Sequence, residues 1–313
     1  MRHTQMKKVL CILILLVATA GAFGEDNPPA TPKPDSGEPL AAGQRIAAAH
    51  HSYFRGLPPL IDEMAKAAHL DGHRFVSAWY IGGSKSLHHW DIRDEVNTTK
   101  KVLVAGSADV LVLTPVYLPD EGIEKFARLG LEHNPDLRVT VQEFWLPFDE
   151  YQPHYYDPPK IPTPAKVDHN AQTGDSLRAM HRRYFDEMDA HLREVNAKLG
   201  RQALFAVPSG QAVIALREKI LAGEAPGLKT QEDLFADPLG HPRPVLQALV
   251  AYVHYAVIYR LNPAGLPVPK ALDDLNLSED EAVKLNRLLQ ELAWDEVLRH
   301  PLSGVVAAGS ERR

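Results

Sequence analysis

A serine, an aspartate and a histidine of this 313-residue chain have the residue types of a hydrolytic triad. Ser52 follows a short apolar segment, and Asp237 and His241 stand shortly before a long apolar one. A serine hydroxyl is a poor nucleophile until a neighbouring imidazole takes its proton, and a carboxylate then orients that imidazole and stabilises its charged form. These residues can attack an ester only if the fold brings them together.

The sequence around these residues predicts strands that alternate with helices. Strands are expected at 45–49, 74–81, 109–114, 137–141 and 203–207, where short apolar runs end at polar or glycine residues. Helices are expected at 58–68, 121–132, 177–199, 211–221 and 244–261, where apolar residues recur at spacings of three and four or fill the whole segment. This alternation predicts an α/β fold: a three-layer, flavodoxin-like parallel sheet of about five strands with helices on both faces.

Sites in such sheets form at the carboxyl ends of the strands. Reading those ends in order gives a short set of polar and glycine residues: Ser52, Gly82-Gly83-Ser84, Thr114 and Pro208-Ser209. Backbone N–H groups must face the oxyanion that develops when an ester is attacked, and glycine lets the backbone approach a substrate closely. The strand ends therefore supply candidates for both parts of a hydrolytic site.

These features together resemble the SGNH, or GDSL-type, hydrolases, over residues 44 to about 267. The resemblance is closest to secreted bacterial branches whose first motif reads like His51-Ser52-Tyr53-Phe54. In those branches a Gly-Gly pair and a tryptophan follow the second strand, as they do here in the segment 82–90. The resemblance implies the predicted fold and a serine hydrolase that uses no cofactor.

The resemblance also implies a role for each candidate residue. Ser52 is then the nucleophile, His241 the base and Asp237 the orienting carboxylate. The backbone amides of Ser52 and Gly83 become the oxyanion donors, and the set of oxyanion or substrate-binding residues is Gly83, Ser84 and Thr114.

Three positions depart from the family pattern. His50 stands where a glycine is usual, Thr114 stands where an amide side chain is expected, and three residues rather than two separate Asp237 from His241. Two functions therefore stay open: a serine esterase or deacetylase acting on an ester or acetyl group of a small molecule or glycan, and a non-catalytic protein of the same fold that binds a ligand or partner. An unrelated α/β binding protein is a third alternative.

The segment Gly174-Asp175-Ser176-Leu177 spells the GDSL motif literally but follows a polar loop instead of a strand. It opens the strongest predicted helix, where Asp and Ser commonly serve as caps, so we predict a capping role for Ser176. Ser278-Glu279-Asp280-Glu281 likewise predicts a capping box at the start of a C-terminal helix.

Histidines and tryptophans near the strand ends allow two other interpretations. The histidines at 50, 51, 88 and 89 could ligate a metal, but no HExxH or other metal-spaced pattern accompanies them, so we predict no metal. The tryptophans at 79, 90 and 145 suit stacking on sugars, and we favour core positions for them instead.

The N-terminus predicts export. Residues 1–24 combine three basic residues, an apolar run and a small-residue end, in the order of a cleavable signal peptide. We expect cleavage between Ala20 and Asp26, a secreted or periplasmic protein, and no stable membrane insertion afterwards. Cys11 is the chain's one cysteine and lies inside the apolar run, so the mature chain would have no disulfide.

Net charge limits the class of partner, and composition divides the chain into segments. The net charge of −6 becomes about −9 without the signal peptide, which argues against nucleic acid as a partner. Residues 25–43 form a Pro-rich linker, 44–268 one α/β domain of the SGNH type, and 269–313 a helical extension and tail. Within the domain, 148–173 is predicted to be a long irregular insertion.

Overall fold

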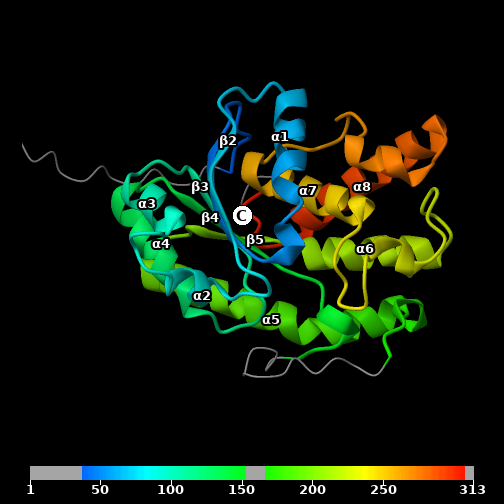
Figure 1. The fold of residues 1–313 in the computed structure, drawn as a ribbon, viewed down its shortest axis with the longest axis horizontal. Helices are drawn as coiled ribbons and strands as arrows, with labels where there is room; N and C mark the ends of the chain where they lie inside the picture. Colours follow the sequence, from blue (N-terminus) through cyan, green and yellow to red (C-terminus); the bar gives the residue numbers. More distant parts are fainter. Residues whose placement is uncertain (1–36, 153–165, 307–313) are drawn as a thin grey trace, which may run out of the picture. The chain divides into compact units, whose positions relative to one another are not determined.

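The computed structural model describes residues 37–152 and 166–306. Its centre is a five-stranded, all-parallel sheet with the strand order β2-β1-β3-β4-β5 (Figure 1). The strands are β1 (Arg45–His50), β2 (Arg74–Tyr80), β3 (Val110–Leu113), β4 (Arg138–Gln142) and β5 (Leu204–Val207). The predicted α/β class and flavodoxin-like order are confirmed, with strand bounds shifted by one or two residues.

The three inner strands are buried along almost their whole length, as the apolar runs in the sequence predict. β3 and β4 are buried at every residue, and β1 at every residue after Arg45. β2 is the exposed edge strand, and its side chains are mostly half-buried or exposed. A parallel strand covered by helices on both faces needs apolar residues on both sides, which explains the continuous runs.

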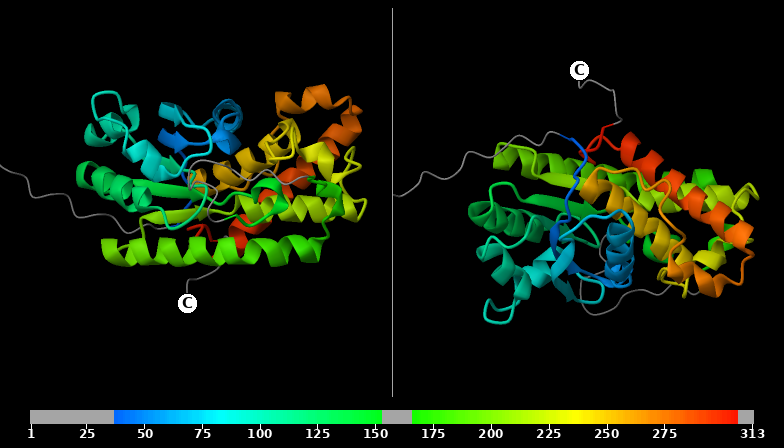
Figure 2. Two further views of the ribbon diagram at one scale, coloured as in Figure 1. Left: turned by 60° about the horizontal axis from the view of Figure 1, so that its bottom comes forward. Right: turned by 90° about the horizontal axis from the view of Figure 1, so that it is seen from above.

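Helices cover both faces of the sheet (Figure 2). β2 and β3 lie on opposite sides of β1 in the sheet. Because connections between parallel strands are right-handed, the helix before β2 and the helices before β3 lie on opposite faces of the sheet. One face carries α1 (Leu57–Ala67), which packs against α7 (Pro244–Tyr259). The other carries α3 (Thr98–Val104) and α4 (Glu121–His133), with α2 (Ser86–Trp90) packed on α4.

The C-terminal half adds α5 (Gly174–Leu199), α6 (Ser209–Leu221) and α8 (Glu279–Arg299). Gly200 ends α5 with a positive φ of 67°, which favours glycine because it has no Cβ. α8 begins at the predicted Ser278 capping box and packs along α7. Its buried side chains, Leu285, Leu289, Ala293 and Val297, belong to the same hydrophobic core as the sheet.

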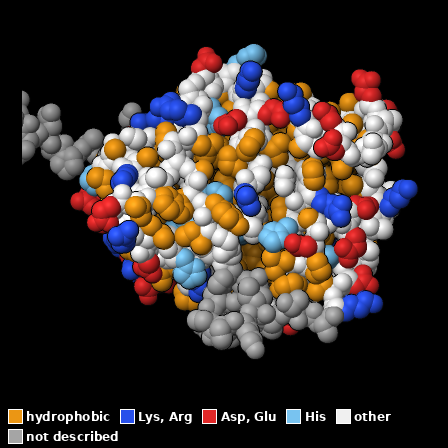
Figure 3. Space-filling model, viewed as in Figure 1, with side chains coloured by type: hydrophobic (Ala, Val, Ile, Leu, Met, Phe, Trp, Pro, Cys, Tyr) orange, Lys and Arg blue, Asp and Glu red, His pale blue; other side chains and the backbone are white. Residues whose placement is uncertain are grey.

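Several segments of the predicted organisation lie outside the described residues. They are the signal peptide, most of the linker, residues 153–165 of the predicted insertion, and the last seven residues. Within 37–152 and 166–306, the helices are too short or too polar to cross a membrane. On the face seen in Figure 3, acidic and basic side chains are interspersed among the residues drawn in colour.

Candidate active site

Ser52 stands at the carboxyl edge of the sheet, two residues after the end of β1, in the short 3-10 helix η1 (Ser52–Phe54). Two hydrogen bonds of the preceding His51 fix this turn: its Nδ1 accepts from the Tyr53 N–H at 3.2 Å, and its own N–H donates to Thr114 Oγ1 at 2.9 Å. His51 and Tyr53 are buried while Ser52 is half-buried. The turn therefore presents the serine between two buried neighbours.

Asp237 and His241 are hydrogen-bonded to each other in the loop that leads to α7. The His241 Nδ1–H donates to Asp237 Oδ2 at 2.6 Å, and the N–H groups of Gly240 and His241 donate to Asp237 Oδ1 at 3.2 Å each. Partial burial raises the pKa of the Asp237 carboxyl, but these hydrogen bonds outweigh it and hold the pKa below its usual value. An ionised Asp237 fixes the proton of a neutral His241 on Nδ1, which leaves Nε2 as an acceptor.

Tyr53 and Trp145 attach this loop to the Ser52 turn. The Tyr53 hydroxyl donates to Leu239 O at 2.6 Å, and the Trp145 Nε1–H donates to Gly240 O at 2.8 Å. The two rings stack with centres 4.4 Å apart and planes 4° from parallel. The Tyr53 ring also meets His241 edge-on, with ring centres 5.7 Å apart. The residue after Ser52 therefore touches both the loop and its imidazole.

The loop after β4, which carries Trp145, also contains Asp149, and Asp149 forms a buried ion pair with Arg217 of α6. Asp149 accepts two hydrogen bonds from Arg217, at 2.6 and 2.8 Å, and a third from His169 Nδ1 at 2.9 Å. Burial raises the pKa of the Asp149 carboxyl, but these donors outweigh it and lower the pKa. Phe148 and Asp149 both have positive φ, 59° and 51°, so this ion pair holds a strained turn.

The last link of a triad is not formed in this structure. Among the described residues, no hydrogen bond joins the Ser52 hydroxyl to His241. The fold thus brings Ser52, Asp237 and His241 to one edge of the sheet and completes the Asp–His pair. Hydrogen bonds to a catalytic nucleophile often tighten only when substrate binds.

The predicted oxyanion and substrate residues follow the neighbouring strands. Gly83 has a φ of 55°, a left-handed conformation that favours glycine and shapes the turn after β2. The buried Ser84 hydroxyl bonds to His89 Nε2 at 2.7 Å, and burial lowers the pKa of His89 to about 3. Thr114 is buried and its Oγ1 accepts from the His51 N–H. Ser84 and Thr114 therefore both support the turns that carry Gly83 and Ser52.

Glu143 is a further candidate site residue, and its position at the end of a strand is a signal that the sequence contains. It directly follows β4, is fully buried, and accepts from His300 Nε2 at 3.1 Å and from Gln211 Nε2 at 3.1 Å. The strand-end residues predicted from the sequence do not include it, because that set lacks the end of the fourth strand. His300 lies just after α8, and the sequence carries no comparable signal for its place beside β4.

Glu143, Asp189 and His300 bring ligand atoms within 4.8 Å of one another, the spacing of a metal site. The hydrogen bonds of His300 favour another interpretation: Nε2 faces both carboxylates, while Nδ1 accepts from the Leu302 N–H at 3.2 Å. A neutral imidazole bound to a metal through Nε2 would carry its proton on Nδ1, where Leu302 already donates. These three residues therefore form a cluster in which His300 donates to Glu143 and lies 3.3 Å from Asp189 Oδ1, and this arrangement does not suit a metal.

The remaining candidates lie in structural positions. Ser176 is part of a capping box with Thr173 at the start of α5, which confirms its predicted capping role. His50 Nδ1–H donates to the His51 carbonyl, and His88 Nδ1 accepts from the Lys85 N–H. Trp145 is in the core as expected, whereas Trp79 and Trp90 are only half-buried.

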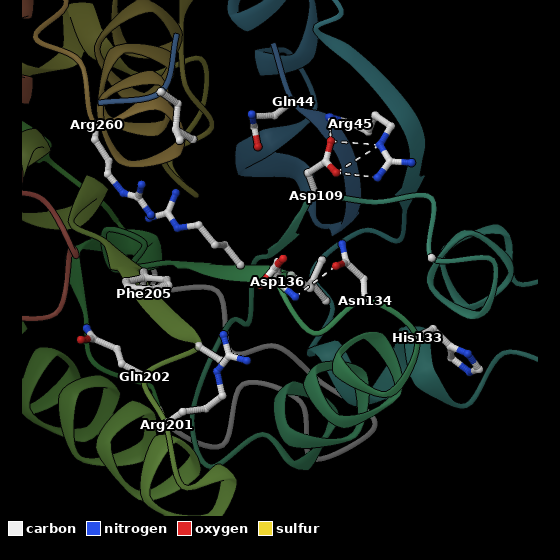
Figure 4. A pocket seen from close by; sticks show the side chains of 15 residues that line it. Gln44, Arg45, Asp109, His133, Asn134, Asp136, Arg201, Gln202, Phe205 and Arg260 are labelled. Atoms are coloured by element: carbon white, nitrogen blue, oxygen red, sulfur yellow. Dashed lines mark hydrogen bonds and ion pairs between the residues drawn. The ribbon is translucent and has the colours of Figure 1, made fainter. Parts of the chain in front are cut away.

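A cavity of about 590 Å³ lies at the opposite, amino-terminal edge of the sheet (Figure 4). Arg45 and Asp109, which form an ion pair at 2.6 Å, line one side, and Arg201 and Arg260 lie across the cavity from them. None of the six predicted site residues lines it. The candidate active site and this cavity are therefore separate features at the two ends of the strands.

Comparisons with known proteins find similarity in structure alone. No family model matches the chain, and no curated protein matches it. Among solved structures, a DUF4886 family protein from Bacteroides uniformis aligns over 81% of this chain and 94% of its own, with 11% identity and a TM-score of 0.49. These values describe a similar chain path in a very different sequence.

Two further solved structures are similar to this chain. A protein from Slackia heliotrinireducens described as a candidate SGNH hydrolase aligns over 68% of this chain and 97% of its own, with 14% identity and a TM-score of 0.40. A candidate GDSL-like lipase from Parabacteroides merdae aligns over 73% and 98%, with 14% identity and a TM-score of 0.43. The side chains at the sheet edge, and not these matches, carry the functional inference.

Proposed function

We propose that this protein is a secreted or periplasmic serine hydrolase of the SGNH type that acts on an ester or acetyl group of a small molecule or glycan. The observation that carries the proposal is the Asp237–His241 pair, 2.6 Å apart, on a loop bonded to the Ser52 turn through Tyr53. In this proposal Ser52 attacks the carbonyl carbon, His241 Nε2 takes its proton, and Asp237 stabilises the resulting imidazolium.

The later steps follow from the same residues. The N–H groups of Ser52 and Gly83 stabilise the oxyanion of the tetrahedral intermediate. The intermediate collapses to an acyl-enzyme when the alcohol leaves with the proton that His241 holds. Water, activated by His241, then attacks the acyl-enzyme and releases the acid and the free Ser52 hydroxyl.

Labelling with a fluorophosphonate tests this proposal, because the reagent reacts with an activated serine. We expect the mature wild-type protein to be labelled and the Ser52→Ala variant to stay unlabelled. Hydrolysis of 4-nitrophenyl acetate should be lost in parallel. N-terminal sequencing of the exported protein tests the localisation, with a first residue expected between Ala20 and Asp26.

A non-catalytic binding protein of the same fold is the second candidate. One observation favours it: among the described residues, the Ser52 hydroxyl has no hydrogen bond to His241. This alternative predicts that the wild-type protein resists the fluorophosphonate and hydrolyses no ester.

A further inference from the structure

An exposed arginine and an exposed tyrosine lie together beside the Ser52 turn. Arg55 follows η1, and its guanidinium carbon lies 5.1 Å from the centre of the Tyr80 ring. Tyr80 ends β2, pairs in register with His50 of β1, and is 41% exposed. The attraction between a guanidinium and an aromatic face restrains Arg55 near the sheet edge.

Arg55 has no carboxylate partner in the described parts of the chain, 37–152 and 166–306. Other arginines differ: Arg45 pairs with Asp109, and Arg217 pairs with Asp149. The Arg55 guanidinium is exposed and keeps its N–H donors available for a ligand.

Tyr80 connects this arginine to the turn after β2. The Tyr80 hydroxyl lies close to Gly82: a Cβ atom added to this glycine would be 3.2 Å from the hydroxyl oxygen. Gly83, the predicted oxyanion donor, is the next residue in the chain. The centre of the Tyr80 ring lies 5.8 Å from that of His50. Arg55 and Tyr80 thus flank the Ser52 turn toward β2, whereas Tyr53 contacts the His241 loop.

We propose, on the basis of the hydrolase function above, that Arg55 and Tyr80 form a subsite for a carboxylate carried by the substrate. A guanidinium matches a carboxylate geometrically and can bind it through two parallel hydrogen bonds. The chain carries a net charge of −6, so a preorganised cation beside the nucleophile offsets the general repulsion of an anionic substrate. The substrate class is therefore an ester with an acidic group close to the scissile bond.

Three esters test the subsite. 4-Nitrophenyl acetate is neutral, 4-nitrophenyl hemisuccinate carries a carboxylate on the acyl side, and 4-acetoxybenzoate carries one on the leaving group. The three esters differ in intrinsic reactivity, so each kcat/KM is divided by the rate constant for hydrolysis of the same ester by hydroxide. We expect this ratio in the wild type to be higher for at least one anionic ester than for 4-nitrophenyl acetate. Added salt should weaken that preference, because it screens an exposed charge.

The Arg55→Gln variant should lower kcat/KM for the preferred anionic ester by about tenfold or more, the loss expected for a charge-assisted hydrogen bond. Its kcat/KM for 4-nitrophenyl acetate should stay unchanged. Arg74→Gln is the matched control, because it removes the same charge from the start of β2, about 20 Å along the strand from Tyr80. This control should leave all three rates unchanged.

If the ratio of kcat/KM for the anionic ester to kcat/KM for 4-nitrophenyl acetate is the same in the wild type and in Arg55→Gln, the subsite proposal is wrong. The hydrolase proposal would still stand. If the wild type hydrolyses none of the esters, the hydrolase proposal fails, and calorimetric titration with 4-hydroxybenzoate decides the subsite separately. Binding to the wild type that Arg55→Gln loses and Arg74→Gln keeps would support the subsite. Absent binding, or binding that Arg55→Gln retains, would overturn it.

Discussion

Ser52 and Ser176 both stand at the start of a helical turn, but their surroundings differ. The Ser176 hydroxyl accepts from the Thr173 N–H and bonds to Gln172 Oε1, each at 2.9 Å, so local partners use it fully. The Ser52 hydroxyl has no hydrogen bond in the part of the chain that the structure describes. The literal GDSL serine, Ser176, therefore has a capping role in this fold. A hydroxyl left available at the carboxyl edge of the sheet is the better candidate for the nucleophile.

The strongest test of this comparison is Ser52→Ala. We expect esterase activity to fall by about a thousandfold or more, because the acyl-enzyme can no longer form. The free energy of unfolding should change by no more than about 0.5 kcal/mol, because the hydroxyl makes no hydrogen bond. Initial rates on 4-nitrophenyl acetate and urea unfolding measure the two quantities. Retained activity would show that another residue is the nucleophile.

Changes to the Asp–His pair should follow next in size. His241→Ala should reduce kcat about as much as Ser52→Ala, because no other described imidazole is paired with Asp237. Asp237→Asn should cost less, about a hundredfold, because the Asp237 side chain is 42% exposed and water partly replaces its field. Steady-state kinetics compare the two variants, and a larger loss in Asp237→Asn would contradict these roles.

Tyr53→Phe should have a smaller effect that is confined to the Ser52 region. The change removes the hydroxyl that bonds to Leu239 O but keeps the ring stacked on Trp145. A loosened loop misplaces His241, so we expect kcat to fall about tenfold with little change in KM. Steady-state kinetics on 4-nitrophenyl acetate measure both constants, and an unchanged kcat would mean that Trp145 alone positions the loop.

Acid should destabilise the fold through the buried histidines near the Ser52 turn. Burial lowers the pKa of His51 and His89 to about 3 in the folded protein, against an ordinary value of 6.5. The unfolded chain therefore binds more protons below about pH 6.5, so their contribution to stability is present above that pH and is lost as the pH falls toward 3. Below about pH 6.5, each of these histidines should lower the free energy of unfolding by about 1.4 kcal/mol for every unit by which the pH falls.

Urea unfolding between pH 7 and pH 4.5 measures this acid effect. His51→Gln removes one titrating group, so the free energy of unfolding should fall less steeply with decreasing pH in this variant, by about 1.4 kcal/mol per pH unit. A stability that does not change over this range would contradict the assignment of buried, neutral histidines.

Ser176→Ala should have the smallest effect. The variant loses part of a capping box, so we expect at most about 1 kcal/mol less stability and full activity. Thermal unfolding and ester hydrolysis measure the two quantities. If this variant lost activity while Ser52→Ala kept it, the comparison between the two serines would be reversed.

The sequence by itself determined the order of elements and much of the candidate site. Apolar runs at β1, β3, β4 and β5 predict buried parallel strands because such strands need apolar side chains on both faces. Gly200 and Ser278 mark helix ends through backbone conformation and capping, which are local properties. The short helices α2 and α3 were not predicted, because five to seven residues show too little periodicity.

Tertiary structure decided which of these residues meet. The contacts of Tyr53 with Leu239 and of Trp145 with Gly240 join positions 186 and 95 residues apart. Glu143 and His300, 157 residues apart, are paired in the same way. Residue types and spacing fix hydrogen bonds within one turn, such as Asp237 with His241. Contacts between distant segments depend on how helices pack against a twisted sheet, and no local pattern in the sequence encodes that packing.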